Sequence, residues 1–129
     1  MVFPYQITSG AAYPVIKISL VYKNTKLTVD ALVDSGANIS IFAADVAESL
    51  GIDVESGKEV FLTGVGGRIL GYEHFLNVEI AEKRLRCPVI FSQEFLVSFN
   101  LIGRKGIFDK FTICFNEAKQ VVEIEPLKL

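Results

Sequence analysis

One short segment carries residue types that can do hydrolytic chemistry, the tripeptide Asp34-Ser35-Gly36. It follows the apolar run Ala31-Leu32-Val33, which predicts a carboxylate held at the end of a buried strand. Gly36 permits a tight turn directly after it, and the Ser35 hydroxyl can bind backbone across a dimer axis. Two such carboxylates side by side share one proton and activate a water molecule. Because the chain has only one such triplet, a second copy of the chain must supply the other carboxylate.

A glycine-rich segment lies further along the chain, where Gly64, Gly66 and Gly67 surround Val65. Glycines at a hairpin tip, between strands of β-forming residues, predict a mobile lid that admits an extended peptide and then excludes water. An ordinary glycine-rich turn is the alternative. A phosphate-binding loop fits less well, because a strand follows and no Gly-Lys-[Ser/Thr] is present.

The third segment is Leu101-Ile102-Gly103-Arg104, two apolar residues and a glycine that lead into a short helix. Taken alone it is a strand-to-helix turn, just as Asp34-Ser35-Gly36 taken alone is a surface β-turn. The order and spacing of the three segments on one chain favour a common site.

The elements that must position these segments are mostly strands, since short runs of alternating, β-branched and aromatic residues fill the chain. About nine short strands with one or two short helices predict a single all-β domain of β-barrel type over residues 1–129. The expected helices are residues 43–51 and 104–110. The expected strands are residues 15–22, 26–33, 59–63, 68–72, 75–81, 85–91, 111–115 and 120–125.

Composition excludes several classes of function. The formal charge of −2 and the lack of a basic face exclude a nucleic-acid site; the basic run Lys83–Arg86 is expected to mark a hairpin turn. Cys87 and Cys114 are expected to be buried free thiols rather than a disulfide. A lone histidine, His74, gives metal chemistry nothing to work with. It could in principle serve a serine or cysteine hydrolase centre, but no motif marks a nucleophile nearby, and it is expected at an exposed strand end. We expect no cofactor, no membrane contact and a soluble, cytoplasmic protein.

The three segments together resemble the retropepsin-type aspartic protease domain, the family of retroviral proteases and their cellular relatives. The resemblance covers about residues 14–125 and implies a single-lobed barrel of β-strands that is active as a two-fold homodimer on polypeptide substrates. It implies a catalytic Asp34 in an active-site loop with Ser35, Gly36 and Ala37. It also implies a flap at Gly64, Val65, Gly66 and Gly67, a substrate pocket at Ile39, Ile41 and Val65, and structural support from Asn38, Leu101, Ile102, Gly103 and Arg104.

Two positions depart from the family pattern. Ser35 stands where threonine is commoner, and it keeps the hydroxyl without the methyl. Asn38 stands where many members carry an aspartate that pairs with the arginine matching Arg104; the amide can still accept a hydrogen bond from that arginine. Family dimers often interleave their chain ends, and Val121–Ile124 is the candidate strand.

Two other interpretations stay open. The same fold can serve as a catalytically silent dimerisation or peptide-binding module, although an intact Asp34 and glycine-rich flap favour an enzyme. The chain can also be half of a two-lobed enzyme that pairs with a different chain. Asp30, Asp45, Asp53 and Asp109 lack the Ser-Gly context and are expected in turns, at helix caps or on the surface.

Overall fold

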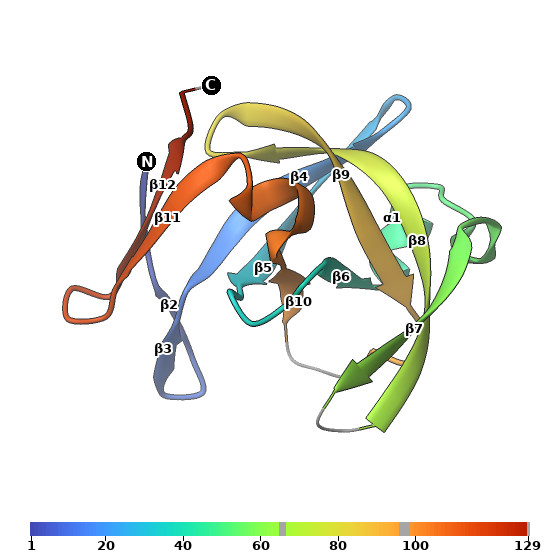
Figure 1. The fold of residues 1–129 in the computed structure, drawn as a ribbon, viewed down its shortest axis with the longest axis horizontal. Helices are drawn as coiled ribbons and strands as arrows, with labels where there is room; N and C mark the ends of the chain where they lie inside the picture. Colours follow the sequence, from blue (N-terminus) through green and yellow to red (C-terminus); the bar gives the residue numbers. More distant parts are fainter. Residues whose placement is uncertain (65–66, 96–98, 129) are drawn as a thin grey trace.

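The computed structural model describes residues 1–64, 67–95 and 99–128, and strands dominate it (Figure 1). Three short helical segments interrupt the strands: α1 (Ala44–Ser49), the 3-10 turn η1 (Val54–Ser56) and the turn η2 (Arg104–Phe108). The strands are β1 (Val2–Pro4), β2 (Gln6–Thr8), β3 (Ala11–Tyr13), β4 (Val15–Tyr22), β5 (Thr25–Val33), β6 (Ser40–Ala43), β7 (Lys58–Gly64), β8 (Gly67–Ile80), β9 (Lys83–Ser92), β10 (Asn100–Ile102), β11 (Phe111–Asn116) and β12 (Val121–Pro126).

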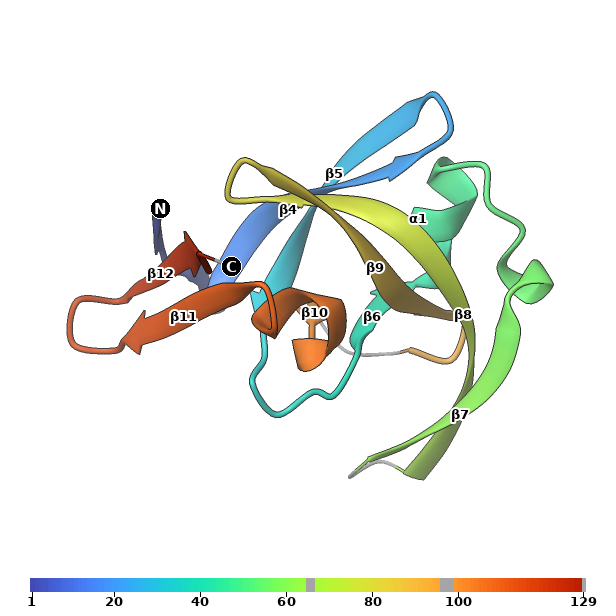
Figure 2. The same ribbon diagram turned by 45° about the horizontal axis from the view of Figure 1, so that its top comes forward.

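The largest sheet has the strand order β4-β5-β10-β6-β9-β8-β7. Strand β4 also pairs with β8, from Ser19 opposite Glu79 to Val21 opposite Asn77, so six of the strands close into a ring of neighbours. Strand β7 pairs with β8 alone, and the two strands leave the ring as a long ribbon (Figure 2). Strands β2 and β3 form a separate hairpin, and β1, β12 and β11 form a three-stranded sheet at the chain ends.

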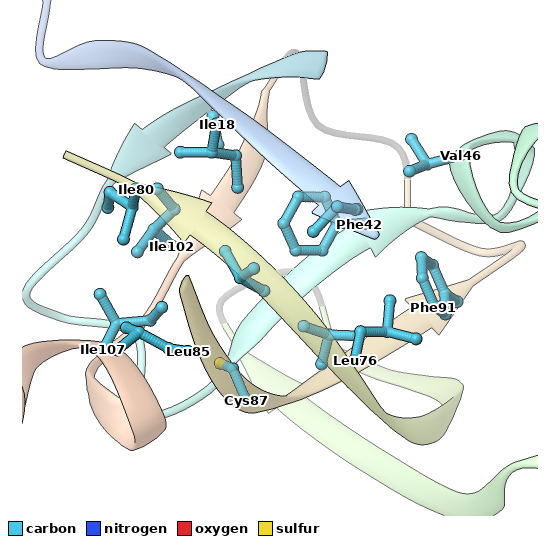
Figure 3. Close-up of a cluster of buried hydrophobic side chains, with 14 of the residues drawn as sticks. Ile18, Phe42, Val46, Leu76, Ile80, Leu85, Cys87, Phe91, Ile102 and Ile107 are labelled. Carbon is cyan, nitrogen blue, oxygen red and sulfur yellow. The ribbon is translucent and has the colours of Figure 1, made fainter. Parts of the chain in front are cut away.

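The core lies inside this ring, where the strands meet with the apolar side chains that alternate with outward-facing ones along each strand. Along β4, Ile16, Ile18 and Leu20 are buried, while Lys17 between them is exposed. Figure 3 shows Ile18, Phe42, Leu76, Phe91 and their neighbours gathered from strands far apart in sequence. The ends of β5, β6 and β10 are therefore fixed by packing at the place where the Asp34 segment leaves the sheet.

Several sequence predictions are confirmed and others are wrong. The 15–22 strand and its hairpin partner are confirmed. The two strands expected at 68–72 and 75–81 are one continuous strand, β8, because Glu73 and His74 pair with β9 despite their polarity. The turn expected at Lys83–Arg86 instead lies at Ala81 and Glu82, which have positive φ, and the basic residues belong to β9. The second helix is only a five-residue turn, with non-helical backbone at Lys105 and Gly106.

Two side-chain predictions also need correction. His74 is not at a strand end but inside β8, half-buried, and its Nε2 lies 2.8 Å from the carbonyl oxygen of Val54. Both cysteines are free, but only Cys87 is buried; Cys114 is exposed because it lies on the outer face of β11.

Candidate active site

Asp34 lies directly after β5, and the backbone on both sides of it is fixed. The Val33 N–H donates to the Pro14 carbonyl at 2.9 Å, and the Asp34 N–H donates to the Ile102 carbonyl at 3.0 Å. Val33 and Ile102 are both buried, so the strand ends cannot shift without disturbing the core. The carboxylate is therefore projected from a rigid base, as its position after an apolar run predicts.

A tight turn orients the carboxylate. The Gly36 N–H donates to Asp34 Oδ1 at 2.9 Å, and the Ala37 N–H donates to the Asp34 carbonyl at 3.2 Å. This is the local side-chain-to-backbone pattern that aspartate favours in turns. A Cβ added at Gly36 would lie 3.2 Å from the same Oδ1, which leaves little room for a larger residue. Ser35, next to Asp34 in the sequence, is exposed.

The Asp34 loop, residues 34–39, rests on the segment that follows β10. The Arg104 N–H donates to the Ala37 carbonyl and the Lys105 N–H to the Asn38 carbonyl, each at 2.9 Å. Gly103 is buried, and a Cβ there would lie 2.4 Å from the carbonyl carbon and oxygen of Ile39. The glycine of the Leu-Ile-Gly segment is thus required by close backbone approach.

The expected bond between the side chains of Asn38 and Arg104 does not occur among the described residues. The Arg104 side chain is exposed, and the main chains of 104 and 105 support the loop instead. Because main-chain hydrogen bonds support the loop, the neutral side chain of Asn38 does not remove an ion pair on which the loop depends. Asn38, Gly103 and Arg104 are brought together as expected, although through different atoms.

Strand β10 connects the two segments that the sequence singled out. It runs parallel to β5, with Leu101 opposite Leu32 and Ile102 opposite Val33, and antiparallel to β6, with Leu101 opposite Ile41. The 99–104 segment therefore passes between the strand that enters the Asp34 loop and the strand that leaves it. This placement explains why two segments so distant in sequence act on the same loop.

Sequence reasoning missed two polar residues that hold this crossing together. Asn100 donates from Nδ2 to the Asp30 carbonyl at 3.1 Å and accepts the Ala43 N–H at 3.1 Å, so it joins β5 to β6. Ser40 is 2 % exposed, and its Oγ accepts the Gly103 N–H at 3.0 Å. A lone polar residue in an otherwise apolar run is the signal that marks both positions.

The glycine-rich segment lies at the end of the β7–β8 ribbon, as expected for a hairpin. Gly64 pairs with Gly67, and Leu62 pairs with Ile69 behind them. Val65 and Gly66 lie outside the described residues, so the structure places neither the valine of the expected flap nor its part in the pocket. The Arg68 guanidinium lies 4.2 Å from the ring centroid of Phe61, a cation–π contact between the two arms.

The other expected pocket residues lie on both sides of the Asp34 loop's exit. Ile39 is half-buried at the end of the loop, next to Gly103. Ile41 is half-buried on β6, in register with Leu101 on one side and Ile90 on the other. Apolar side chains therefore surround the place where the loop rejoins the sheet.

Two further observations limit the chemistry that the described residues can do. Among residues 1–64, 67–95 and 99–128, no cluster of three or more His, Cys, Asp or Glu side chains could hold a metal ion. Burial raises the pKa of the Cys87 thiol to about 12, so this cysteine is no nucleophile at neutral pH.

No helix in the described part of the chain is long and apolar enough to span a membrane.

At the chain ends, β12 is paired along both edges within one chain. Val122 lies opposite Phe3 of β1 on one side and opposite Phe115 of β11 on the other. Within one chain, Val121–Ile124 therefore belongs to the central strand of this three-stranded sheet, and its interleaving with a partner stays a prediction. The free edges of the three-stranded sheet belong to β1 and β11.

Comparisons with known proteins agree with this geometry. A family model described as aspartyl protease matches residues 18–103, which include the Asp34 loop, the ribbon and β10. Among solved structures, the EIAV protease in complex with the inhibitor HBY-793 is similar, with a TM-score of 0.56 at 16 % sequence identity over 77 % of this chain and 88 % of that one. A comparison with curated protein sequences gives no match. The chain belongs to the aspartyl protease family and has a fold of the retropepsin type.

Proposed function

We propose that the protein is an aspartic endopeptidase whose active site forms when two copies of the chain bring their Asp34 carboxylates together. The observation that carries this proposal is the fixed carboxylate: Gly36 holds Asp34 Oδ1, and Ile102 holds the backbone of Asp34. Buried residues at the ends of β5 and β10 hold this carboxylate at the start of a largely exposed loop, where a second chain can approach it. Membership of the aspartyl protease family supports the same chemistry.

In the proposed dimer, the two Asp34 side chains lie side by side on a two-fold axis. Like charges about 3 Å apart cannot both ionise, so the pair holds one proton. The ionised carboxylate removes a proton from the bound water, and the protonated one donates a hydrogen bond to the scissile carbonyl. As the water attacks, the two carboxylates exchange roles and the leaving nitrogen is protonated. The apparent pKa values of this titration belong to the pair.

The β7–β8 ribbon is the proposed flap over the substrate. Extended peptides bind readily as an added strand, because main-chain hydrogen bonds give affinity and side-chain pockets give selectivity. The residues proposed for the pocket are Ile39 and Ile41 and, by the family resemblance, Val65, and we therefore expect apolar residues on both sides of the cleaved bond. Cleavage confined to bonds flanked by charged residues would contradict this assignment.

Because β12 is paired on both edges within one chain, we propose a dimer contact other than the interleaving of Val121–Ile124 between two chains. A second copy can extend the three-stranded sheet only at β1 or β11. Strand β1 contains Pro4, which has no N–H to donate to a partner strand. Strand β11 leads back to η2, which carries the backbone groups that support the Asp34 loop. We propose β11 as the edge nearer the two-fold axis.

The test is cleavage of an unbiased peptide library between about pH 4 and pH 7, the range in which a shared-proton pair works. Wild type is compared with Asp34→Asn and with Asp45→Asn, a matched change at an exposed aspartate of α1. We expect wild type and Asp45→Asn to cleave at the same discrete sites and Asp34→Asn to be inactive. Cleavage by all three variants would place the activity elsewhere. Inactivity of all three, with a folded dimer, would favour a binding module.

A further inference from the structure

The β7–β8 ribbon has one more attachment to the body of the protein than its strand pairing provides. Pairing of β8 with β9 ends where Tyr72 lies opposite Phe91, while pairing of β7 with β8 continues to Gly64 and Gly67. Leu70 lies just beyond the end of the β8–β9 ladder, on the side toward the ribbon tip. Both backbone groups of Leu70 nevertheless have partners, and these are side chains.

Two residues at the end of β9 bind Leu70. The Ser92 hydroxyl donates to the Leu70 carbonyl at 2.6 Å. The Glu94 carboxylate accepts the Leu70 N–H, with Oε2 at 3.2 Å and Oε1 at 3.4 Å. The Glu94 N–H donates in turn to Ser92 Oγ at 3.1 Å, which fixes the two side chains relative to each other.

These contacts replace the ladder that would continue if β9 were longer. Ser92 is 1 % exposed, so its bond to the Leu70 carbonyl is shielded from water. The bond to Glu94 has a charged acceptor, but it is long and exposed to water, so it is weaker than the buried Ser92 bond. Breaking either one leaves a backbone group of Leu70 without its protein partner.

The position of this attachment matters for movement of the ribbon. Next to Leu70, a Cβ on Gly71 would lie 2.4 Å from Ile90 Cγ2, so the ribbon lies directly against β9 there. Further out, residues 62–64 and 67–69 have, among the described residues, hydrogen bonds only within the ribbon. Leu70 is thus the last point at which the ribbon is bonded to the rest of the described chain.

We propose that Ser92 and Glu94 form a clamp that fixes the base of the β7–β8 ribbon through the Leu70 backbone and limits how often the ribbon opens. In the peptidase they are positioning residues, because they act on substrate only through the ribbon. The effect on catalysis rests on the proposed function, in which the ribbon is the flap. The effect of the clamp on opening of the ribbon does not depend on the proposed function.

Amide hydrogen exchange measures the clamp directly. We expect the Leu70 amide to exchange about threefold faster in Glu94→Ala, as loss of an exposed hydrogen bond to a charged acceptor implies. Amides of the central strands, such as Val89, should keep their wild-type rates. Glu48→Ala, at an exposed site on α1, is the control and should leave Leu70 unchanged. Equal exchange of Leu70 in wild type and Glu94→Ala would overturn the proposal.

Kinetics provide the second measurement and separate the clamp from general stability. Glu94→Ala and Ser92→Ala should raise KM for an extended peptide several-fold, because an open ribbon binds substrate less often, while kcat changes less. Glu94→Gln keeps an acceptor oxygen and should recover part of the loss. A fall in kcat with KM unchanged, and no recovery in Glu94→Gln, would count against the clamp. If wild type cleaves no peptide, the proposed function fails, and the Leu70 exchange rate still decides whether the clamp exists.

Discussion

Replacing Gly103 with alanine places a methyl group against the backbone beneath the Asp34 loop. The new Cβ would lie 2.4 Å from the carbonyl carbon and oxygen of Ile39 and 2.8 Å from its nitrogen, whereas real Cβ contacts are not shorter than 3.0 Å. These neighbours are main-chain atoms and cannot rotate away. The adjacent loop carbonyls are also held by the N–H groups of Arg104 and Lys105.

The energetic cost follows from this lack of freedom. Overpacking a well-packed core costs about 1–3 kcal/mol, and a contact with fixed backbone belongs at the upper end. A loss of about 3 kcal/mol, at an m-value of about 1.5 kcal/mol/M, lowers the urea midpoint by about 2 M. The Asp34 loop must also move, so we expect peptidase activity to fall even at low urea concentrations where the protein is folded.

Urea unfolding followed by circular dichroism measures the change in the free energy of unfolding. Gly51→Ala is the control, because a Cβ there meets no atom within 4 Å and only the positive φ of +77° is strained, at a cost of about 1 kcal/mol. If Gly103→Ala is no more destabilising than Gly51→Ala, the close approach of residues 39 and 103 is wrong, and so is the account of the loop that rests on it.

Three further predictions concern single side chains. Ser40→Ala leaves the buried Gly103 N–H unpaired and should lower the free energy of unfolding by about 1–3 kcal/mol. The control Ser19→Ala removes an exposed hydrogen bond with Thr28 and should lower it by less than about 0.5 kcal/mol. Equal losses would argue against the Ser40 bond. Hydrogen bonds from Lys26 and Arg84 lower the pKa of Glu79 from 4.5, so these bonds stabilise the fold above that pH and the effect is lost as pH falls through the lowered pKa. The difference in urea midpoint between wild type and Glu79→Gln should thus be present at about pH 7 and shrink as the pH falls below 4.5, and a constant difference would contradict the shift. Because Cys87 is buried with a pKa of about 12 and Cys114 is exposed, a thiol reagent at neutral pH should modify one cysteine rapidly and the other only after unfolding; two fast reactions would refute this.

The parts of the fold that sequence predicts are those with a local signal. Strands β4 and β5 alternate apolar and polar residues and are joined by a short turn, so their hairpin is readable from the sequence. Asp34 is readable for the same reason, since it ends an apolar run and is followed by glycine. The glycine-rich segment likewise marks a hairpin turn between two strands by its local composition.

The parts that sequence does not predict depend on distant partners. Strand β10 has only three residues, and it exists because β5 and β6 flank it. A lone polar residue in an apolar run marks Ser40 and Asn100, but nothing in the sequence identifies the distant backbone groups that they and Glu94 bind. The pairing of β12 on both edges depends in the same way on where β1 and β11 meet it.

The central claim is that one active site uses Asp34 from two chains, and mixing subunits tests it most directly. Wild type is unfolded with about a threefold excess of Asp34→Asn, and the two are refolded together and assayed for peptide cleavage. If each site needs two intact carboxylates and subunits pair at random, activity per wild-type chain falls to about a quarter of that of wild type refolded alone. Activity per wild-type chain that does not change with the Asp34→Asn excess would mean that a single chain carries the whole catalytic centre, and the account given above would be wrong.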